Sequence, residues 1–374
     1  MKKSLIALAL AGAFSSAAFA QSSVTIYGLI DETIHHESNV TAVGTPGGSS
    51  KTLLDGGAFN GNRLGFKGKE DLGDGMSALF VLEDGFNLNN GTQNQSGRLF
   101  GRQAYVGLSF GAPATITLGR QNGTFFALFG ASDPLGWGNS TQDEWQQSLI
   151  TGIRYDNTLQ YSGTFGPVGV LVQHAFGGVA GSTTEQSSTG GALTLALGPF
   201  NGQIGSQQAK DALGDKETTT GGGFSVAFAP VTGYAQYFDA KRDPGFNSGA
   251  AATAGLDSAI GTLSGFANTL KRTDKYFVVG AGFQATPADL ITVAYMYDKI
   301  TNVDSTGTDG KISTIYAYYA HNLSVRTTVY VGLNYGKATD GAKTATNEGG
   351  SQILGLGAGQ GSGVDYSLGI RHRF

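Results

Sequence analysis

The 374-residue chain has no cysteine, only 8 prolines and 2 tryptophans, and no stretch near the ~18 consecutive apolar residues that a membrane-spanning helix needs. The absence of cysteine excludes a disulfide framework and fits an exported chain that avoids oxidative pairing. Glycine is abundant, with 60 residues, as are phenylalanine with 22 and tyrosine with 15. This composition favours β-structure with many turns and aromatic belts over helices. A chain of this kind that entered a membrane would have to span it as a closed barrel.

Basic residues are also few. Without Lys2 and Lys3, which precede an apolar leader segment, 22 basic face 28 acidic residues, a formal net charge of −6. That balance argues against a nucleic-acid partner. The chain has no P-loop, and its five histidines, at 35, 36, 174, 321 and 372, show no metal-binding spacing, so we expect no cofactor, no metal and no catalytic site.

The N-terminus has the three parts of a secretory signal peptide. Lys2 and Lys3 form a basic region, residues 5–14 an apolar region, and Ala18-Phe19-Ala20 a small-residue cleavage site. We therefore expect residues 1–20 to be removed, leaving a mature domain of residues 21–374.

The C-terminus is a strand of period two that runs to the last residue. One face carries Val364, Tyr366, Leu368, Ile370, His372 and Phe374, and the other Asp365, Ser367, Arg371 and Arg373. A half-apolar strand suits a wall with lipid on one side and water on the other. The terminal Phe374 resembles the ending of clients of the barrel-insertion machinery, although His372 stands where an aromatic ring is usual.

Between the termini, two kinds of connection alternate. Short ones rich in Gly, Pro, Asp or Asn occur at 71–75, 111–113, 163–167, 198–200, 229–233, 286–289 and 321–324. Long polar ones occur near 37–59, 89–97, 122–150, 178–190, 210–218, 242–272, 301–310 and 338–361. Seven short and eight long connections, with both termini on the short-turn side, predict sixteen antiparallel strands in a transmembrane β-barrel. A soluble β-sandwich shows similar alternation along its strands, but it explains neither the terminal Phe nor the alternating connections.

Three motifs carry a family resemblance: residues 21–28 (QSSVTIYG), 62–73 (NRLGFKGKEDLG) and 98–108 (RLFGRQAYVGL). With 118–121 (LGRQ) and Phe374, they closely resemble Gram-negative general porins, particularly the β-proteobacterial branch. The resemblance implies a trimeric, sixteen-stranded pore in the outer membrane. It also implies that the third extracellular loop folds into the lumen and faces a row of arginines across a constriction.

Counting along the strands gives an independent candidate for that row. Arg63, Arg102 and Arg154 each lie eight or nine residues before a short turn, which predicts that they share one height. Arg63 and Lys67 alternate with Leu64 and Phe66, so these two basic side chains should face water.

The other arginines are harder to orient. Arg98 and Arg102 share a face with apolar residues, but a charge facing lipid could cost roughly 2–4 kcal/mol near the midplane, which favours the lumen for both. Tyr105 and Leu99 should then face out. Arg120 shares its face with Ile116 and Leu118, so we expect it to point away from the lumen and to contact a neighbouring subunit.

The acidic side of the constriction should come from residues 122–150. Asp133, Asp143 and Glu144 are the only carboxylates there, and the loop tip departs from the wording usual in the family. The sequence does not decide which of them reaches the pore. Asp31, on one face with Tyr27 and Leu29, is a further candidate for the lumen.

These patterns predict passive diffusion of small hydrophilic solutes and ions, with a modest preference for anions. A substrate-specific porin is the alternative and would need an aromatic slide, for which Trp137 and Trp145 are the only tryptophans. An outer-membrane enzyme of the phospholipase type would need a serine beside a lipid-facing histidine such as His372.

Overall fold

The computed structural model describes residues 23–42, 45–111, 114–136, 138, 152–246, 268–344 and 360–374. The segment assigned to the signal peptide, and Asp143, Glu144, Trp137 and Trp145, lie outside these residues. None of the helices in the described ranges is both long and apolar enough to cross a membrane.

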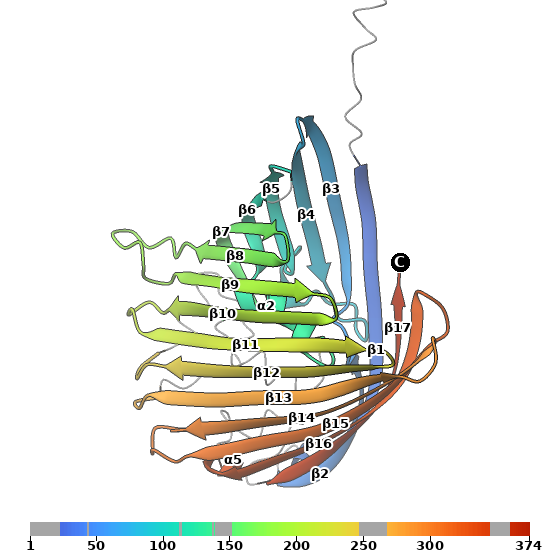
Figure 1. The fold of residues 1–374 in the computed structure, drawn as a ribbon. Coiled ribbons are helices and arrows are strands. Elements are labelled where there is room, and N and C mark those ends of the chain that lie inside the picture. The colour runs from blue at the N-terminus through green and yellow to red at the C-terminus, as the bar shows by residue number, and fades with distance from the viewer. Residues whose placement is uncertain are drawn as a thin grey trace, which may run out of the picture.

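Strands make up most of the described chain, and every adjacent pair is antiparallel (Figure 1). Their bounds are β1 Ser23–Ala42, β2 Thr45–Gly56, β3 Arg63–Gly73, β4 Met76–Gly85, β5 Gln103–Ser109, β6 Ala114–Asn122, β7 Arg154–Phe165, β8 Val168–Ala175, β9 Ser188–Leu197, β10 Phe200–Lys210, β11 Lys216–Phe228, β12 Val231–Arg242, β13 Arg272–Gln284, β14 Asp289–Thr301, β15 Gly310–Asn322, β16 Thr327–Asp340 and β17 Ser362–Arg373. The short helices are η1 Gln95–Gly97, α2 Thr124–Leu128, η2 Phe129–Ser132 and α5 Gly341–Thr344. The seven short turns fall where the sequence predicts them.

β1 closes the sheet into a barrel. One of its edges pairs with the last strand, β17, from Leu29 opposite Arg373 to Glu37 opposite Asp365. Its other edge pairs first with β3 and then, further along, with β2. Because β2 and β3 follow each other along that one edge, the 17 strands of the sheet occupy sixteen positions, which confirms the predicted closed sixteen-stranded barrel.

The first long connection differs from its prediction. Residues 37–59 were expected to form a polar loop, but β1 and β2 continue as a hairpin in which Lys51 pairs with Glu37 at 3.0 Å. β2 carries few apolar residues, and its adjacent Leu53 and Leu54 lie on opposite faces, so it lacks the apolar alternation by which a half-buried strand is recognised. Cross-strand pairing with β1 stabilises it instead.

Alternation along the strands separates two faces. On β1, Val24 and Ile26 are 65% and 64% exposed, whereas Asp31 and Thr33 are completely buried. The exposed apolar residues form the outer face of the barrel, and the buried polar ones line its inner face.

Backbone packing at the chain end fixes how β1 meets the terminal strand. Gly28 exchanges two backbone hydrogen bonds with Phe374, of 3.0 and 3.1 Å. A Cβ atom added at Gly28 would lie 2.3 Å from Cζ of Phe374 and 2.9 Å from the carbonyl oxygen of Arg63. Only glycine lets the terminal ring lie against this strand.

We therefore expect Gly28→Val to destabilise the barrel by about 1–3 kcal/mol through overpacking at the closure. The matched control is Gly233→Val on β12, where an added Cβ meets nothing within 4 Å. Urea-unfolding midpoints in detergent measure the difference. Equal midpoints for the two variants would contradict this role for Gly28.

Candidate pore constriction

The three arginines counted from the turns lie in one row across β3 to β7. Arg63 is the partner of Gly85 on β4, and Arg154 is the partner of Asn122 on β6. Arg102 lies just before β5, and its Cγ atom would be 3.0 Å from a Cβ atom added at Gly85, the partner of Arg63. Arg102 is therefore close to Arg63 along the barrel wall, and Arg154 follows on β7.

Arg63 and Lys67 lie on the inner face beside Tyr27. Lys67 Nζ is 5.2 Å from the centre of the Tyr27 ring, and Arg63 Nε donates to the carbonyl oxygen of Gly61 at 3.2 Å. Within the part of the chain that the structure describes, neither cation has a carboxylate within ion-pair distance. These two positive charges are therefore available to the lumen.

Arg102 has a carboxylate partner that the sequence analysis did not name. Its Nε lies 2.7 Å from Oε1 of Glu83 on β4, and the side chains are only 9% and 5% exposed. The Tyr27 hydroxyl donates to the other oxygen of Glu83 at 2.9 Å. A search for carboxylates at strand spacing along the polar face of residues 76–85 could have found Glu83.

Tyr105 corrects a predicted orientation. It was expected to face outward, but it is paired with Val81 on β4 and lies on the same face as Glu83, whereas Val106 is 56% exposed on the outer face. Arg102 precedes the regular strand, so its side chain does not follow the alternation of β5, which was the assumption behind the prediction.

Arg98 and Arg120 meet at one carboxylate. Both contact Asp156 at 2.7 Å, one on each carboxylate oxygen, and Arg120 Nε also donates to the carbonyl oxygen of Gly101 at 2.7 Å. Arg120 is buried within its own subunit, so no intersubunit contact is needed to satisfy it. The contacts of Arg98 place it with Arg120 and not beside Arg63.

A bulge brings this cluster together. The pairing of β6 with β7 shifts register between Gly119 and Gln121, and Asn157 has a left-handed φ of 52°. A bulge places two residues opposite one and redirects the side chains around it. If successive side chains of residues 153–161 are assigned alternately to the outer and inner faces, part of β7 therefore receives the wrong face.

Arg154 is buried and lies 5.1 Å from the ring of Phe126 on α2. The helices α2 and η2 lie in the third long connection, residues 122–150, which is called the third connection below. Asp133 follows directly after η2. That carboxylate is 2% exposed and accepts a hydrogen bond of 2.8 Å from the Leu135 amide. Asp143 and Glu144 lie outside the described residues.

The third connection also packs against strands that follow β7 in the barrel. The Thr124 amide donates to Gln207 on β10, and Gln236 on β12 donates to the Phe129 carbonyl and the Ser132 hydroxyl, at 2.6 and 2.8 Å. Gln207 and Gln236 are buried, while Ile204 and Tyr237 on the same strands are exposed. The contacts therefore use the inner faces of β10 and β12.

A break between β2 and β3 adds an unexpected feature near Asp31. The segment 57–62 leaves the strand edge, and Asp31 accepts hydrogen bonds from the Asn60 amide at 2.8 Å and the Tyr330 hydroxyl at 2.7 Å. Phe59 stacks on Tyr330 at 4.1 Å, and the Arg371 guanidinium lies 5.3 Å from the Phe59 ring. The polar face of the terminal strand thus supplies a further arginine to the inner wall.

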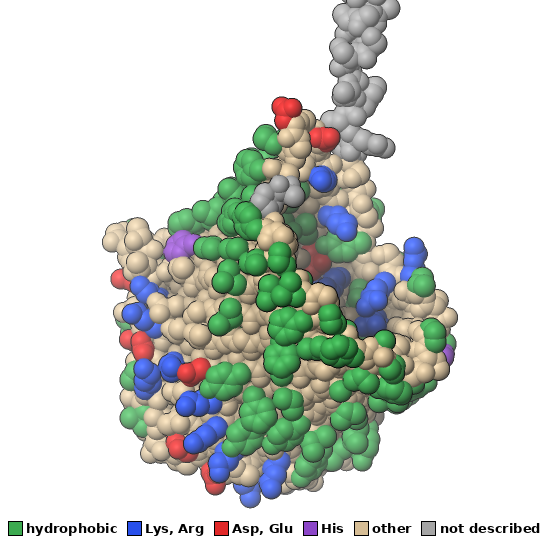
Figure 2. Space-filling view, viewed as in Figure 1, with side chains coloured by type: hydrophobic (Ala, Val, Ile, Leu, Met, Phe, Trp, Pro, Cys, Tyr) green, Lys and Arg blue, Asp and Glu red, His purple; other side chains and the backbone are tan. Residues whose placement is uncertain are grey.

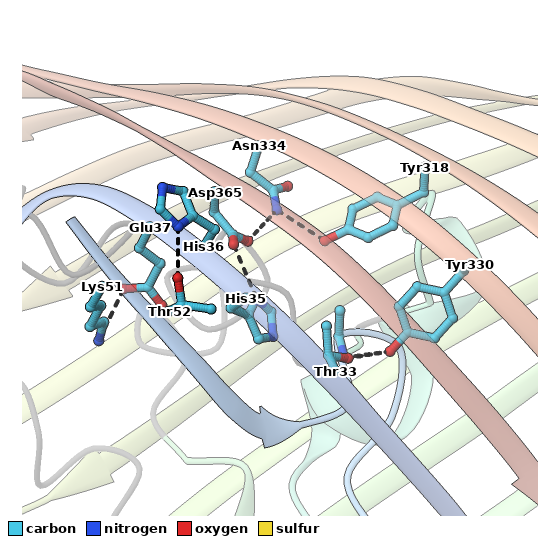
Figure 3. A network of polar contacts seen from close by, with 11 residues as sticks. Thr33, His35, His36, Glu37, Lys51, Thr52, Tyr318, Tyr330, Asn334 and Asp365 are labelled. Carbon is cyan, nitrogen blue, oxygen red and sulfur yellow. Dashed lines mark hydrogen bonds and ion pairs between the residues drawn. The ribbon is translucent and has the colours of Figure 1, made fainter.

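A polar network continues this wall along β1, β16 and β17 (Figure 3). His35 Nδ1 lies 3.1 Å from Asp365, and Asn334 donates to Asp365 and to the Tyr318 hydroxyl, both at 3.0 Å. These bonds tie buried polar side chains of β1, β15, β16 and β17 to one another across the inner wall.

The shared carboxylate gives a test of the cluster. We expect Asp156→Asn to lower the free energy of unfolding by about 1–3 kcal/mol, because the buried Arg120 and the partly exposed Arg98 lose a shared counter-charge. The control is Asp340→Asn, which removes a carboxylate that is 59% exposed and 3.7 Å from Lys311, a pair worth about 0–1 kcal/mol. Urea titrations in detergent compare the variants, and equal losses would remove any special role for the cluster.

The chain matches known proteins over most of its length. The family model described as Gram-negative porin matches residues 7–341. The outer membrane porin protein 32 of Delftia acidovorans is 31% identical over all of both chains. An outer membrane porin protein of Bordetella pertussis is 40% identical over 43% of this chain and 44% of that protein.

Solved structures show the same fold. The anion-selective porin from Comamonas acidovorans superposes with a TM-score of 0.74 at 23% identity, covering 95% of this chain and all of that one. A trimer form of OmpT of Vibrio cholerae has a TM-score of 0.64 at 13% identity, covering 94% and 99%. With its closed sixteen-stranded barrel and a family match that covers most of its length, the chain belongs to the Gram-negative porins, the channels of the outer membrane.

Proposed function

We propose that this porin passes small hydrophilic solutes and ions by passive diffusion and that it prefers anions modestly. The observation that carries the proposal is the row of Arg63, Arg102 and Arg154 in a closed barrel whose inner face is polar. Fixed charges act most strongly where water is confined between walls of low dielectric constant.

The third connection is the proposed narrowing element. Its described residues pack against the inner faces of β10 and β12 through Gln207 and Gln236, and Phe126 lies over Arg154. An added Cβ at Gly190 or Gly223 would lie 2.4 Å from Thr124 or Ser132, so glycines on the wall make room for the segment. These contacts support a loop that reduces the free cross-section beside the arginine row.

The preference for anions should be modest because part of the positive charge is neutralised. Glu83 pairs with Arg102, and Asp31 lies near Arg371. Arg63 and Lys67 form no ion pair among the described residues, although Glu83 also attracts Arg63, and they would contribute most to the local field. Net charge of the whole chain says little here, because most acidic groups lie far from the row.

Assembly and export complete the proposal. We expect residues 1–20 to be cleaved and the strand ending at Phe374 to be recognised by the barrel-insertion machinery. We also expect a homotrimer embedded in outer-membrane lipid, as the trimer form of the Vibrio cholerae neighbour illustrates for that protein.

The constriction is tested by reversal potentials in planar bilayers under a chloride gradient. The wild type should show the anion sign, weakening as salt screens the field. Arg63→Ala with Arg154→Ala should shift the potential toward cations, whereas Lys210→Ala, at the end of β10, should leave it unchanged. An unchanged potential in the double variant would place the selectivity elsewhere.

The oligomer is tested separately. The protein in mild detergent should scatter light as a trimer and migrate on gels as a heat-modifiable species, because closed porin barrels resist unfolding until heated. A monomer at all detergent concentrations would refute the trimer while leaving the pore assignment intact.

A further inference from the structure

Two arginines of the last strand reach the inner face of the barrel. Arg371 lies opposite Asp31 on β1 and Arg373 lies opposite Leu29, and both of these β1 residues are buried on the inner face. Directly opposite residues of a sheet point to the same side, so both arginines face the lumen. Arg371 is half-buried and Arg373 is exposed. We call Arg371 and Arg373 the terminal-strand pair.

Arg63 adjoins the terminal-strand pair. Leu29 is the partner of Arg373 along one edge of β1 and of Arg63 along the other, so the two arginines stand in one line across three strands. With about 5 Å between opposite Cβ atoms, theirs are about 10 Å apart, within reach of long side chains. Figure 2 shows Lys and Arg side chains around the hollow at the upper right, near β1, β3 and the end of β17 in Figure 1.

Asp31 is the carboxylate that faces Arg371 most directly, but other groups already occupy it. Its two oxygens accept hydrogen bonds from the Tyr330 hydroxyl at 2.7 Å and from the Asn60 amide at 2.8 Å. Asp31 attracts Arg371 without forming an ion pair with it. Half-neutralised in this way, Arg371 still has donors free for a further anion.

Glu83 is the carboxylate nearest to Arg63. It attracts Arg63, but its ion pair is with Arg102, at 2.7 Å. In the part of the chain that the structure describes, neither member of the terminal-strand pair lies within ion-pair distance of a carboxylate. Positive charge therefore exceeds negative charge on this part of the inner wall.

The segment 57–62 folds inward and is tied to the wall beside Arg371. The Gly57 amide donates to the Asp31 carbonyl oxygen at 2.8 Å, and the Ala58 amide donates to the Tyr330 hydroxyl at 3.0 Å. A Cβ atom added at Gly57 would lie 1.9 Å from Cγ of Asp31, so only glycine permits this approach. Backbone contacts thus fix the segment in place.

This segment orients the guanidinium group of Arg371. Nη1 of Arg371 donates to Oδ1 of Asn60 at 3.1 Å, and the group lies 5.3 Å from the centre of the Phe59 ring, which stacks on Tyr330. Nη2 donates to the Thr328 hydroxyl at 3.4 Å. These partners are neutral, so they fix the direction of the guanidinium group without cancelling its charge. Its remaining N–H donors can bind a ligand.

Charge and donor geometry identify the class of ligand. Guanidinium groups bind planar and tetrahedral oxyanions through pairs of parallel hydrogen bonds. Three such groups around one space attract a dianion more strongly than a monoanion, because the Coulomb energy grows with the product of the charges. A phosphate group fits this requirement, since it carries about −1.5 to −2 charges at neutral pH and offers three terminal oxygens.

We propose that the terminal-strand pair and Arg63 form a binding subsite for solutes that carry a phosphate group, and that residues 57–62 hold Arg371 in its binding orientation. Chloride responds to the field of the arginine row, whereas a phosphate group is held by direct hydrogen bonds. The subsite rests on the proposed pore function, because a solute reaches it only through the lumen.

The test measures how solutes block chloride current through the full mature protein in planar bilayers at about pH 8, where phosphate is mainly a dianion. Inorganic phosphate and glycerol 3-phosphate are compared with glycerate, a monoanionic carboxylate. Both phosphates should halve the current at a concentration about tenfold lower than glycerate does. The more potent of the two phosphates tells whether the free ion or an ester is the preferred solute.

Arg371→Gln/Arg373→Gln should raise the half-blocking concentration of both phosphates about tenfold. The matched control is Lys275→Gln/Lys299→Gln, which removes two exposed cations that are partners on the outer face of β13 and β14. The control should be blocked as the wild type is. Urea midpoints in detergent verify that both double variants are folded.

Asn60→Ala tests the positioning role of the segment. It removes the side-chain contact with Arg371 but keeps the backbone bond to Asp31. The half-blocking concentration of phosphate should rise about threefold, while that of glycerate stays the same. Arg371→Lys keeps the charge but loses the planar fork, so it too should lose the advantage of phosphate over glycerate.

Equal half-blocking concentrations in the wild type and Arg371→Gln/Arg373→Gln would overturn the subsite. So would a wild type that glycerate blocks as strongly as phosphate does, or an Arg371→Lys variant that phosphate blocks as it does the wild type. The sign of the chloride reversal potential is a separate result. An anion-selective wild type without phosphate block would remove the subsite alone, whereas a cation-selective wild type would refute the proposed anion preference.

Discussion

Everything in this structure depends on the backbone hydrogen bonds that join the first strand to the last. Within a membrane an unpaired amide or carbonyl costs several kcal/mol, so an open sheet edge is not tolerated there. β1 meets that constraint by pairing with β17 along one edge and with β2 and β3 along the other. Gly28 lets Phe374 lie against β1, so the seam is closed up to the last residue.

Closure creates two surfaces with opposite solvents. The outer face carries Val24, Ile26 and their equivalents, while the inner face gathers charged groups such as Asp31 and Glu83. Buried charges there are acceptable because each is hydrogen-bonded, as Glu83 is to Arg102 and Tyr27.

Local pairing decides which charges act at a distance. The opposite charges of Arg102 and Glu83 cancel over a short range. Asp156 holds Arg98 and Arg120 in one cluster. Arg63 and Lys67 form no ion pair among the described residues, although Glu83 also attracts Arg63, so more of their positive charge acts on the lumen. A chain of net charge −4 can in this way present a positive inner wall at one level.

Sequence alone determined the strand count, the seven short turns and the family. These follow from period-two alternation and from Gly, Pro, Asp and Asn at turns, which are local signals. The arginines 63, 102 and 154 could also be placed in one row, because their distance from a turn is a matter of counting along an extended chain.

Only the tertiary structure decided the remaining features. β2 carries few apolar residues, in no alternating pattern, and is held by its pairing with β1, so no local pattern in the sequence predicts it. The bulge between Gly119 and Gln121 and the irregular backbone before β5 redirect side chains, which made simple alternation fail at Tyr105 and around Asp156. The contact of Glu83 with Arg102 became visible only in the structure, because which residues lie side by side is set by strand pairing between distant segments and not by the sequence around each residue.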